Sequence, residues 1–128
     1  LGVDLKKDET VLNAAYNDRA GITRDFNLNV LSHLNREYGT DFNEAAFDHL
    51  ARYNPDEGCI EMFLVSRVEQ TVTLANESFR LEEGEVIHTE NSHKYAVDEV
   101  RQMALNAGFG SIRIWSDQDE LFAVFYLS

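Results

Sequence analysis

Cysteine is almost absent from this chain of 128 residues, which contains only Cys59. A single cysteine forms no intramolecular disulfide, and the sequence has no CxxC pair of the kind that binds zinc. Because Cys59 precedes an alternating apolar run, we expect a buried structural thiol and not a nucleophile. The shortage of cysteine also favours a reducing, cytoplasmic location.

Basic residues are also few, since 11 Lys and Arg face 23 Asp and Glu and the formal net charge is −12. An acidic surface repels the phosphates of nucleic acids and of anionic lipids. No hydrophobic run in the sequence approaches the length of a membrane span. We therefore expect no nucleic acid and no membrane among the partners.

Glycine-rich signature loops are missing as well. The sequence contains no GxGxxG, GxxxxGK[ST] or GxSxG motif, so it predicts no dinucleotide loop, phosphate loop or hydrolase elbow. Its hydrophobic fraction of 44% and aromatic fraction of 11% are typical of one globular domain with a sizeable core.

The first half of the chain shows mainly helical spacing. Asp8 can cap one helix, and Gly39 can end a second helix whose apolar residues recur every fourth position from Ile22 to Tyr38. The expected elements are a short strand at 1–5, helices at 6–18 and 21–38, and a third, shorter helix at 41–50.

After the turn sequence YNPDEG the period changes from near 3.6 to 2. The alternation predicts a meander of three or four antiparallel strands, followed by a helix that Gly108 ends and a terminal hairpin. The expected strands lie at 60–65, 70–75, 78–81 and 85–92, the helix at 97–107, and the hairpin at 111–117 and 121–128.

This order of elements predicts the fold class α/β. Strand and helix at the start, with helix and hairpin at the end, suit a doubly wound sheet, whereas the middle resembles an α+β insertion. A lone first strand needs neighbours, so we expect the chain to be a piece of a larger protein. The exposed sheet edges of such a piece predict self-association.

The segment HTENSHKY crowds polar side chains into eight residues, 88 to 95. On a regular strand His88, Glu90 and Ser92 would share a face, and His93 would point the other way. The other two histidines lie on predicted helices, so this spacing predicts no metal site.

Glu90 and Ser92 would place a carboxylate beside a hydroxyl, which suits a cationic or N–H-rich ligand such as an imidazole, a guanidine or an amine. Composition alone favours the alternative, a solvent-exposed strand edge. Tyr16 is either a core tyrosine with its hydroxyl at the surface or a phenol that donates to a ligand carboxylate. Met62 lies either in the core or in a pocket wall.

Five stretches, in order along the chain, resemble one family. They are GVDLKKDETVLNAAYND, GITRDFNLNVLSHLNREYGTDF, ARYNPDEGCIEMFLVS, EGEVIHTENSHKY and LNAGF. Together they are similar to the C-terminal part of the histidine-specific, S-adenosyl-L-methionine (SAM)-dependent methyltransferases of the ergothioneine pathway and its relatives. The resemblance covers essentially the whole chain.

The resemblance implies a fragment of a class I (Rossmann-like) methyltransferase with an inserted α+β substrate domain. Residues 1–6 and 94–128 would be the C-terminal portion of the methyltransferase domain: late sheet strands, the last helix and the terminal hairpin. Residues 7–93 would be most of the substrate domain. SAM would be the cosubstrate of the parent protein, with nearly all of its contacts outside this chain, so the fragment alone would be inactive.

The resemblance also implies substrate contacts. Tyr16 matches a tyrosine that contacts the histidine carboxylate, Glu90 and Ser92 match residues that bind the imidazole, and Met62 matches a pocket-lining methionine. No catalytic residue and no metal ligand carries over. The implied reaction is methyl transfer to the α-amino nitrogen of histidine, in which positioning supplies much of the catalysis. The alternatives are a non-enzymatic α+β ligand-binding or interaction domain and a methyltransferase of the same fold with a different acceptor.

Overall fold

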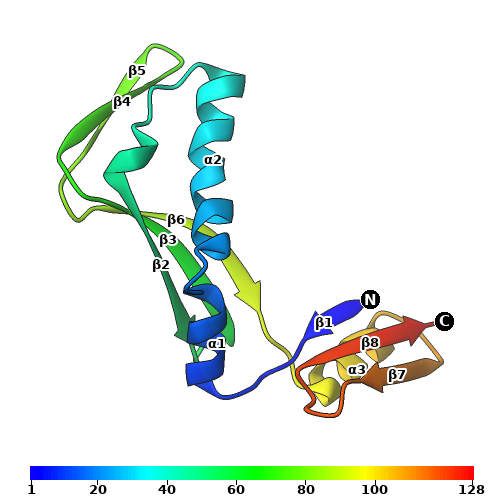
Figure 1. Ribbon diagram of the computed structural model, residues 1–128. Coiled ribbons are helices and arrows are strands. Elements are labelled where there is room, and N and C mark those ends of the chain that lie inside the picture. The colour runs from blue at the N-terminus through cyan, green and yellow to red at the C-terminus, as the bar shows by residue number, and fades with distance from the viewer.

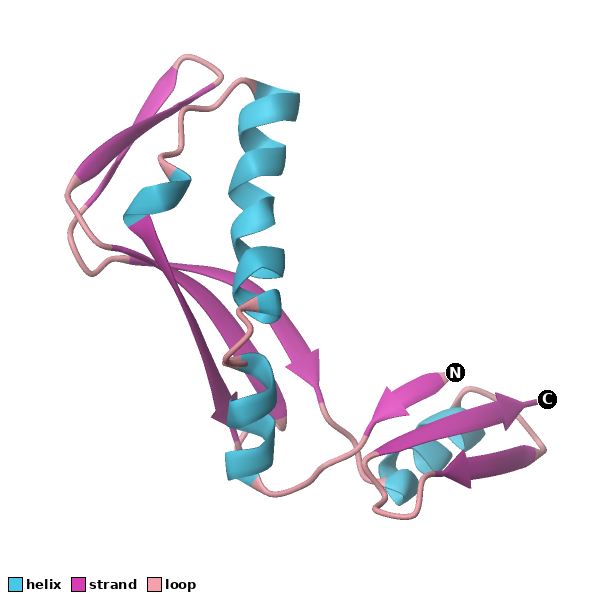
Figure 2. Cartoon of the chain, viewed as in Figure 1, coloured by secondary structure: helices cyan, strands magenta, loops and turns pink.

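The computed structural model describes residues 1–128, which form two units joined by two adjacent stretches of chain (Figure 1). The smaller unit contains both ends of the chain, and the larger unit contains everything between the first strand and the last helix. Figure 2 shows that each unit combines helices with a sheet. The expected class, α/β, is confirmed, and every pairing between the strands is antiparallel.

The smaller unit is a three-stranded sheet in the order β1-β8-β7 with helix α3 packed on it. Its core joins Val100 of α3 to Val3, Ala123 and Phe125 of the strands. The predicted terminal hairpin and last helix are confirmed, and Gly108 follows the helix with φ +92°. The elements are β1 (Gly2–Asp4), α3 (Val97–Asn106), β7 (Ile112–Ser116) and β8 (Phe122–Leu127).

The larger unit packs two helices on one face of a second sheet, whose order is β2-β3-β6. Leu12 of the first helix and Leu31 of the second reach this face and are almost completely buried. The elements are α1 (Glu9–Tyr16), α2 (Ile22–Tyr38), β2 (Phe47–Asn54), β3 (Cys59–Ser66) and β6 (Val86–His93), with a separate hairpin of β4 (Gln70–Leu74) and β5 (Glu77–Leu81).

Local signals predicted the first two helices, α1 and α2. The Asp8 carboxylate accepts a hydrogen bond of 2.8 Å from the backbone N–H of Thr10 and caps α1, as predicted. Gly39 ends α2 in the left-handed conformation with φ +65°. Cys59 is buried as expected, and burial raises the pKa of its thiol.

The predicted third helix at 41–50 is wrong. Only a single 3-10 turn, Glu44–Ala46, forms there, and the chain then enters strand β2. Phe47 and Ala51 are buried, while Leu50, expected on the buried helical face, is 42% exposed. The pairing of β2 along the whole of β3 and the period-2 burial outweigh the helical spacing.

Two further expectations need correction. The strands after Cys59 do not form one meander, because β4 and β5 pair only with each other and β6 returns to pair with β3. In α2, the row of apolar residues that includes Ile22, Phe26 and Tyr38 is exposed. The buried side chains of this helix are those of Asn27 and Leu31. Hydrogen bonds of Asn27 to the strands fix this rotation of the helix.

The two stretches that join the units lie side by side. Leu5 and Tyr95 form an isolated parallel bridge, with the Lys6 N–H 3.0 Å from the Tyr95 carbonyl oxygen. The Tyr95 N–H in turn donates to the Asp4 carbonyl oxygen at 3.2 Å. No helix in the structure is both long enough and apolar enough to cross a lipid bilayer.

Candidate functional site

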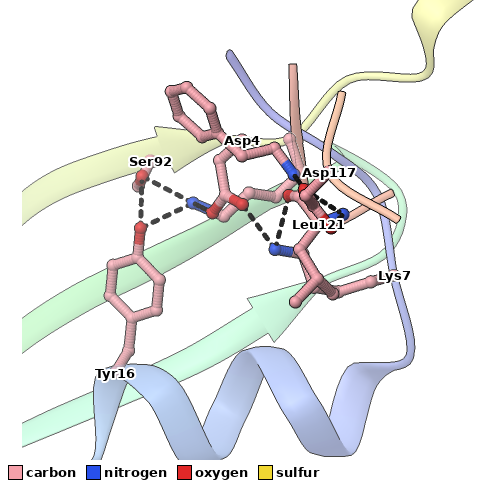
Figure 3. Close-up of polar contacts among 8 residues, drawn as sticks. Asp4, Lys7, Tyr16, Ser92, Asp117 and Leu121 are labelled. Carbon is pink, nitrogen blue, oxygen red and sulfur yellow. Dashed lines mark hydrogen bonds and ion pairs between the residues drawn. The ribbon is translucent and has the colours of Figure 1, made fainter. Parts of the chain in front are cut away.

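Two of the four predicted substrate residues meet where the larger unit approaches the smaller one. Tyr16 is the last residue of α1, and Ser92 lies near the end of β6. Their hydroxyl oxygens are 2.8 Å apart, although 76 positions separate them in the sequence (Figure 3). Packing of α1 across the sheet therefore creates a pair of hydroxyls.

Lys94 contacts both hydroxyls of this pair, although the sequence interpretation gave it no role. Its side chain is fully buried. The ammonium group donates to the Tyr16 Oη at 2.6 Å and to the Ser92 Oγ at 2.8 Å, and it forms an ion pair with the Asp4 Oδ2 at 2.9 Å. A signal for it exists in the sequence, because Lys94 follows Ser92 by two positions and so continues the same face of an extended chain.

Asp4 links the cluster to the smaller unit. Its second oxygen accepts a hydrogen bond of 2.5 Å from Lys7, which also donates to the Leu121 carbonyl oxygen at 2.9 Å (Figure 3). Burial raises the pKa of the Asp4 carboxyl, but the hydrogen bonds and charges of Lys7 and Lys94 outweigh burial and hold that pKa below its usual value. The carboxylate is therefore charged over the whole neutral range.

Glu90 and Met62 are direct partners across the β3–β6 pairing, and so they lie on one face of the sheet. Met62 is only 2% exposed and packs against Leu12, Ala51 and Ile60, which places it in the core. Glu90 is exposed and lines a hollow of about 280 Å³ between β6 and α2. The other residues of that hollow are Phe26, Asn27, Asn29, Val30, His33 and Thr89.

Ser92 borders a different hollow, of about 320 Å³, at the junction of the two units. Asp4 and Tyr95 contribute to its wall from the two joining stretches, and Met103 contributes from α3. Glu90 and Ser92 thus point to the same side of β6 but open onto neighbouring spaces.

His88 does not share the face of Glu90, and this part of the sequence interpretation is wrong. The β3–β6 register shifts between Met62 and Phe63, so that Phe63 pairs with His88 and Thr89 is an extra residue. The His88 ring stacks on Phe63 with centroids 4.8 Å apart, on the face opposite Met62 and Glu90. No three His, Cys, Asp or Glu side chains of the chain gather in a metal-binding group.

A buried network holds this bulge. The Thr89 hydroxyl donates to the Asn27 Oδ1 at 2.6 Å, and the Asn27 amide nitrogen donates to the Phe63 carbonyl oxygen at 3.0 Å. The same amide nitrogen lies 3.0 Å from the His49 Nδ1, whose ring reaches the Tyr16 carbonyl oxygen through Nε2 at 2.8 Å. One network therefore supports both the strand before Glu90 and the helix end that carries Tyr16.

The chain matches one known protein family over its whole length. The family model described as "Histidine-specific methyltransferase, SAM-dependent" matches residues 1–128. The chain belongs to this family. The proteins to which it is similar include two bacterial histidine N-alpha-methyltransferases and two fungal N-methyltransferases.

Histidine N-alpha-methyltransferase of Mycolicibacterium smegmatis is 41% identical over 119 residues, which cover 91% of this chain and 37% of that protein. The enzyme of the same name from Mycobacterium tuberculosis is 40% identical over 120 residues, 92% of the chain and 37% of that protein. N-methyltransferase imqF of Aspergillus flavus is 27% identical over 120 residues, 93% of the chain and 32% of that protein. The chain thus spans just over a third of the length of the bacterial relatives.

The residues of this chain do not fit the nucleotide part of SAM. Two strands lead into helices, β1 into α1 through residues 5–8 and β6 into α3 through residues 94–96, and neither connection contains a glycine. No buried side-chain nitrogen or oxygen is left without a hydrogen-bond partner that a cosubstrate would supply. What the chain offers is a cluster of hydroxyl, carboxylate and ammonium groups beside two hollows.

Proposed function

We propose that this chain is the acceptor-binding, C-terminal portion of a histidine N-alpha-methyltransferase that uses SAM as methyl donor. The family match and the names of the two bacterial relatives support the reaction class. The observation that carries the proposal is the meeting of Tyr16 and Ser92, with Glu90 on the same face of β6. Two hydroxyls are thereby brought together, and a carboxylate lies on the same side of the strand at the adjoining hollow.

The domain division follows the two joining stretches. We assign residues 1–6 and 94–128 to the last part of a class I (Rossmann-like) methyltransferase domain, and 7–93 to an inserted α+β substrate domain. The parallel bridge between Leu5 and Tyr95 supports this division, because the chain leaves and re-enters the smaller unit at one place. A reducing, cytoplasmic location is consistent with the single buried thiol of Cys59.

In this proposal Tyr16 binds the carboxylate of histidine, and Glu90 with Ser92 binds the imidazole. A carboxylate partner strengthens a hydrogen bond from an imidazole N–H, which favours histidine over an amino acid with an apolar side chain. Met62, the cross-strand partner of Glu90, is buried and supports this part of the sheet from the core. SAM supplies the methyl group when it is bound in the rest of the protein. The residues of this chain hold and orient the acceptor, which is where positioning contributes to rate.

The test is methyl transfer by the full-length protein that contains this chain. It would be incubated with SAM and a panel of amino acids, including histidine, arginine, tyrosine and phenylalanine, and the products would be analysed by mass spectrometry. We expect mono- to trimethylation at the α-amino nitrogen of histidine only. Transfer to another acceptor at a higher kcat/KM would overturn the choice of histidine, and a complete lack of transfer would favour a binding module.

A further inference from the structure

The fully buried ammonium of Lys94 has no part in the reaction proposed above, yet it contacts two of the proposed substrate residues. A lysine ammonium carries three N–H donors and no acceptor. The Tyr16 Oη and the Ser92 Oγ accept two of them, and the Asp4 Oδ2 forms an ion pair with the ammonium at 2.9 Å. Because the Lys94 side chain is fully buried among these partners, it can act on a ligand only through them.

The hydrogen-bond count fixes what those neighbours can do. Each hydroxyl oxygen accepts one hydrogen bond from Lys94, so neither hydroxyl proton can point back to the ammonium. One of the two protons lies in the 2.8 Å contact between Tyr16 and Ser92. The other has no partner within the cluster and is free to point toward a ligand.

The local charge also favours a negatively charged ligand. Two ammonium groups, of Lys7 and Lys94, surround the single carboxylate of Asp4. The cluster is thus net positive in a chain whose overall formal charge is −12. A hydroxyl that accepts from an ammonium is also polarised into a stronger donor. Both effects favour an anionic acceptor at this end of the site.

We propose that Lys94 is a positioning residue that makes the Tyr16 hydroxyl a donor for the carboxylate of the bound amino acid, while the Ser92 proton is used in the contact between the two hydroxyls. This rests on the proposed function, and it adds a group without which the phenol would have no fixed direction. Without Lys94, the two hydroxyls are free to donate to each other or to Asp4, and the outward proton is lost.

The experiment is a double-mutant cycle in the full-length protein with Lys94→Met, Tyr16→Phe and the double variant. Binding of histidine and of histamine, which lacks the carboxylate, is measured by calorimetry. We expect Lys94→Met to weaken histidine binding by about 10- to 100-fold, as for loss of a hydrogen bond to a charged group. In the Tyr16→Phe background the same change should cost no more than about twofold. Histamine binding should change little in every variant.

Lys6→Met is the matched control. It removes an exposed ammonium that pairs with Glu99 at 2.6 Å and contacts neither hydroxyl nor Asp4, so histidine affinity should stay within about twofold of the wild type. Thermal unfolding and SAM affinity would verify that each variant is folded. If Lys94→Met does not fold, Lys94→Gln replaces it in the cycle. That variant keeps two N–H donors without the charge, and a smaller effect of the same pattern is expected.

Losses that add in the double variant, or an equal loss for histamine, would show that Lys94 acts only on the stability of the junction and would overturn the inference. So would a Lys94→Met variant that binds histidine like the wild type. A wild-type protein that binds neither histidine nor histamine would overturn the proposed function and this inference together. The two failures are therefore distinguishable.

Discussion

At the residue scale, Glu90 takes its direction from the bulge at Thr89. Without that extra residue the alternation of β6 would have kept His88 on the face of Glu90, as the sequence suggested. Glu90 and Ser92 lie beyond the bulge, so their predicted common face survives it. The Glu90 carboxylate is thereby separated from His88 and left accessible to a ligand.

In the full-length protein, Glu90→Ala should raise the KM for histidine by about 10- to 100-fold, because the imidazole loses a charged hydrogen-bond partner. The KM for SAM should change by less than about twofold. Steady-state kinetics with each substrate varied in turn measures both. Glu61→Ala is the control, since Glu61 lies on β3 next to Met62 and faces the other side of the sheet. An unchanged histidine KM in Glu90→Ala would contradict the assignment.

Asp4 makes the cluster sensitive to acid. Its pKa is lower in the folded protein than the ordinary 3.8, so its contribution to stability is fully present above about pH 4 and is lost as the pH falls through the folded pKa. The free energy of unfolding in urea, measured between pH 7 and pH 3, should therefore fall faster for the wild type than for Asp4→Asn. Parallel curves would show that the ion pairs with Lys7 and Lys94 add nothing.

The residues of the site differ in whether a local sequence pattern predicts their contacts. Glu90 and Ser92 stand two apart on a strand, so alternation alone placed them together. The contact between Tyr16 and Ser92 depends on how α1 lies across the sheet, which no local pattern specifies. Lys94 escaped notice because a lysine after a polar strand normally lies in solvent, and only its three partners explain its burial.

At the scale of elements, the caps of α1 and α2 were predictable, whereas the buried face of α2 and the strand at 47–50 were not. Asp8 acts through a hydrogen bond from the N–H of Thr10, and Gly39 acts through its own left-handed conformation, so a sequence displays both directly. The burial of Asn27 in place of the apolar row of α2 depends on carbonyl and hydroxyl groups of β3 and β6. Residues 47–50 became strand because β3 offers them a full set of pairing partners.

Asn27→Ala should therefore weaken the packing of α2 on both β3 and β6. The change removes the hydrogen bonds to the Phe63 carbonyl and the Thr89 hydroxyl, and we expect a loss of about 1–3 kcal/mol for groups left unpaired in a buried site. Urea unfolding of the chain measures the loss. Asn29→Ala, two residues along the same helix and exposed, should stay within about 0.5 kcal/mol of the wild type. Equal effects at the two positions would contradict this role of Asn27.

At the scale of the whole molecule, one face of the smaller sheet is apolar and exposed. The strands β7 and β8 turn alternate residues, including Ala123 and Phe125, toward α3 and turn the residues between them to the outer face. Trp115 and Val124 are cross-strand partners on the outer face, with exposed fractions of 56% and 47%. Phe122 and Tyr126 extend the same face. Such a patch favours association.

The isolated chain should therefore self-associate through this face. Sedimentation velocity over a dilution series should show a dimer or larger species that dissociates on dilution, and Val124→Lys should shift the equilibrium to monomer because it places a charge in the contact. Val68→Lys, a valine of similar exposure (46%) on the larger unit, should have no such effect. A monomer at every concentration would rule out association through the sheet.

The side-by-side passage of the chain at Leu5 and Tyr95 has an evolutionary consequence. A unit whose two ends emerge at neighbouring points can be exchanged as a cassette, because the host needs to accommodate only one short gap. Acceptor preference could then diverge by replacing or reshaping residues 7–93 while the sheet around β1 and β8 is inherited unchanged. The fungal N-methyltransferases, which are 27% and 28% identical to this chain, are natural donors for such a graft.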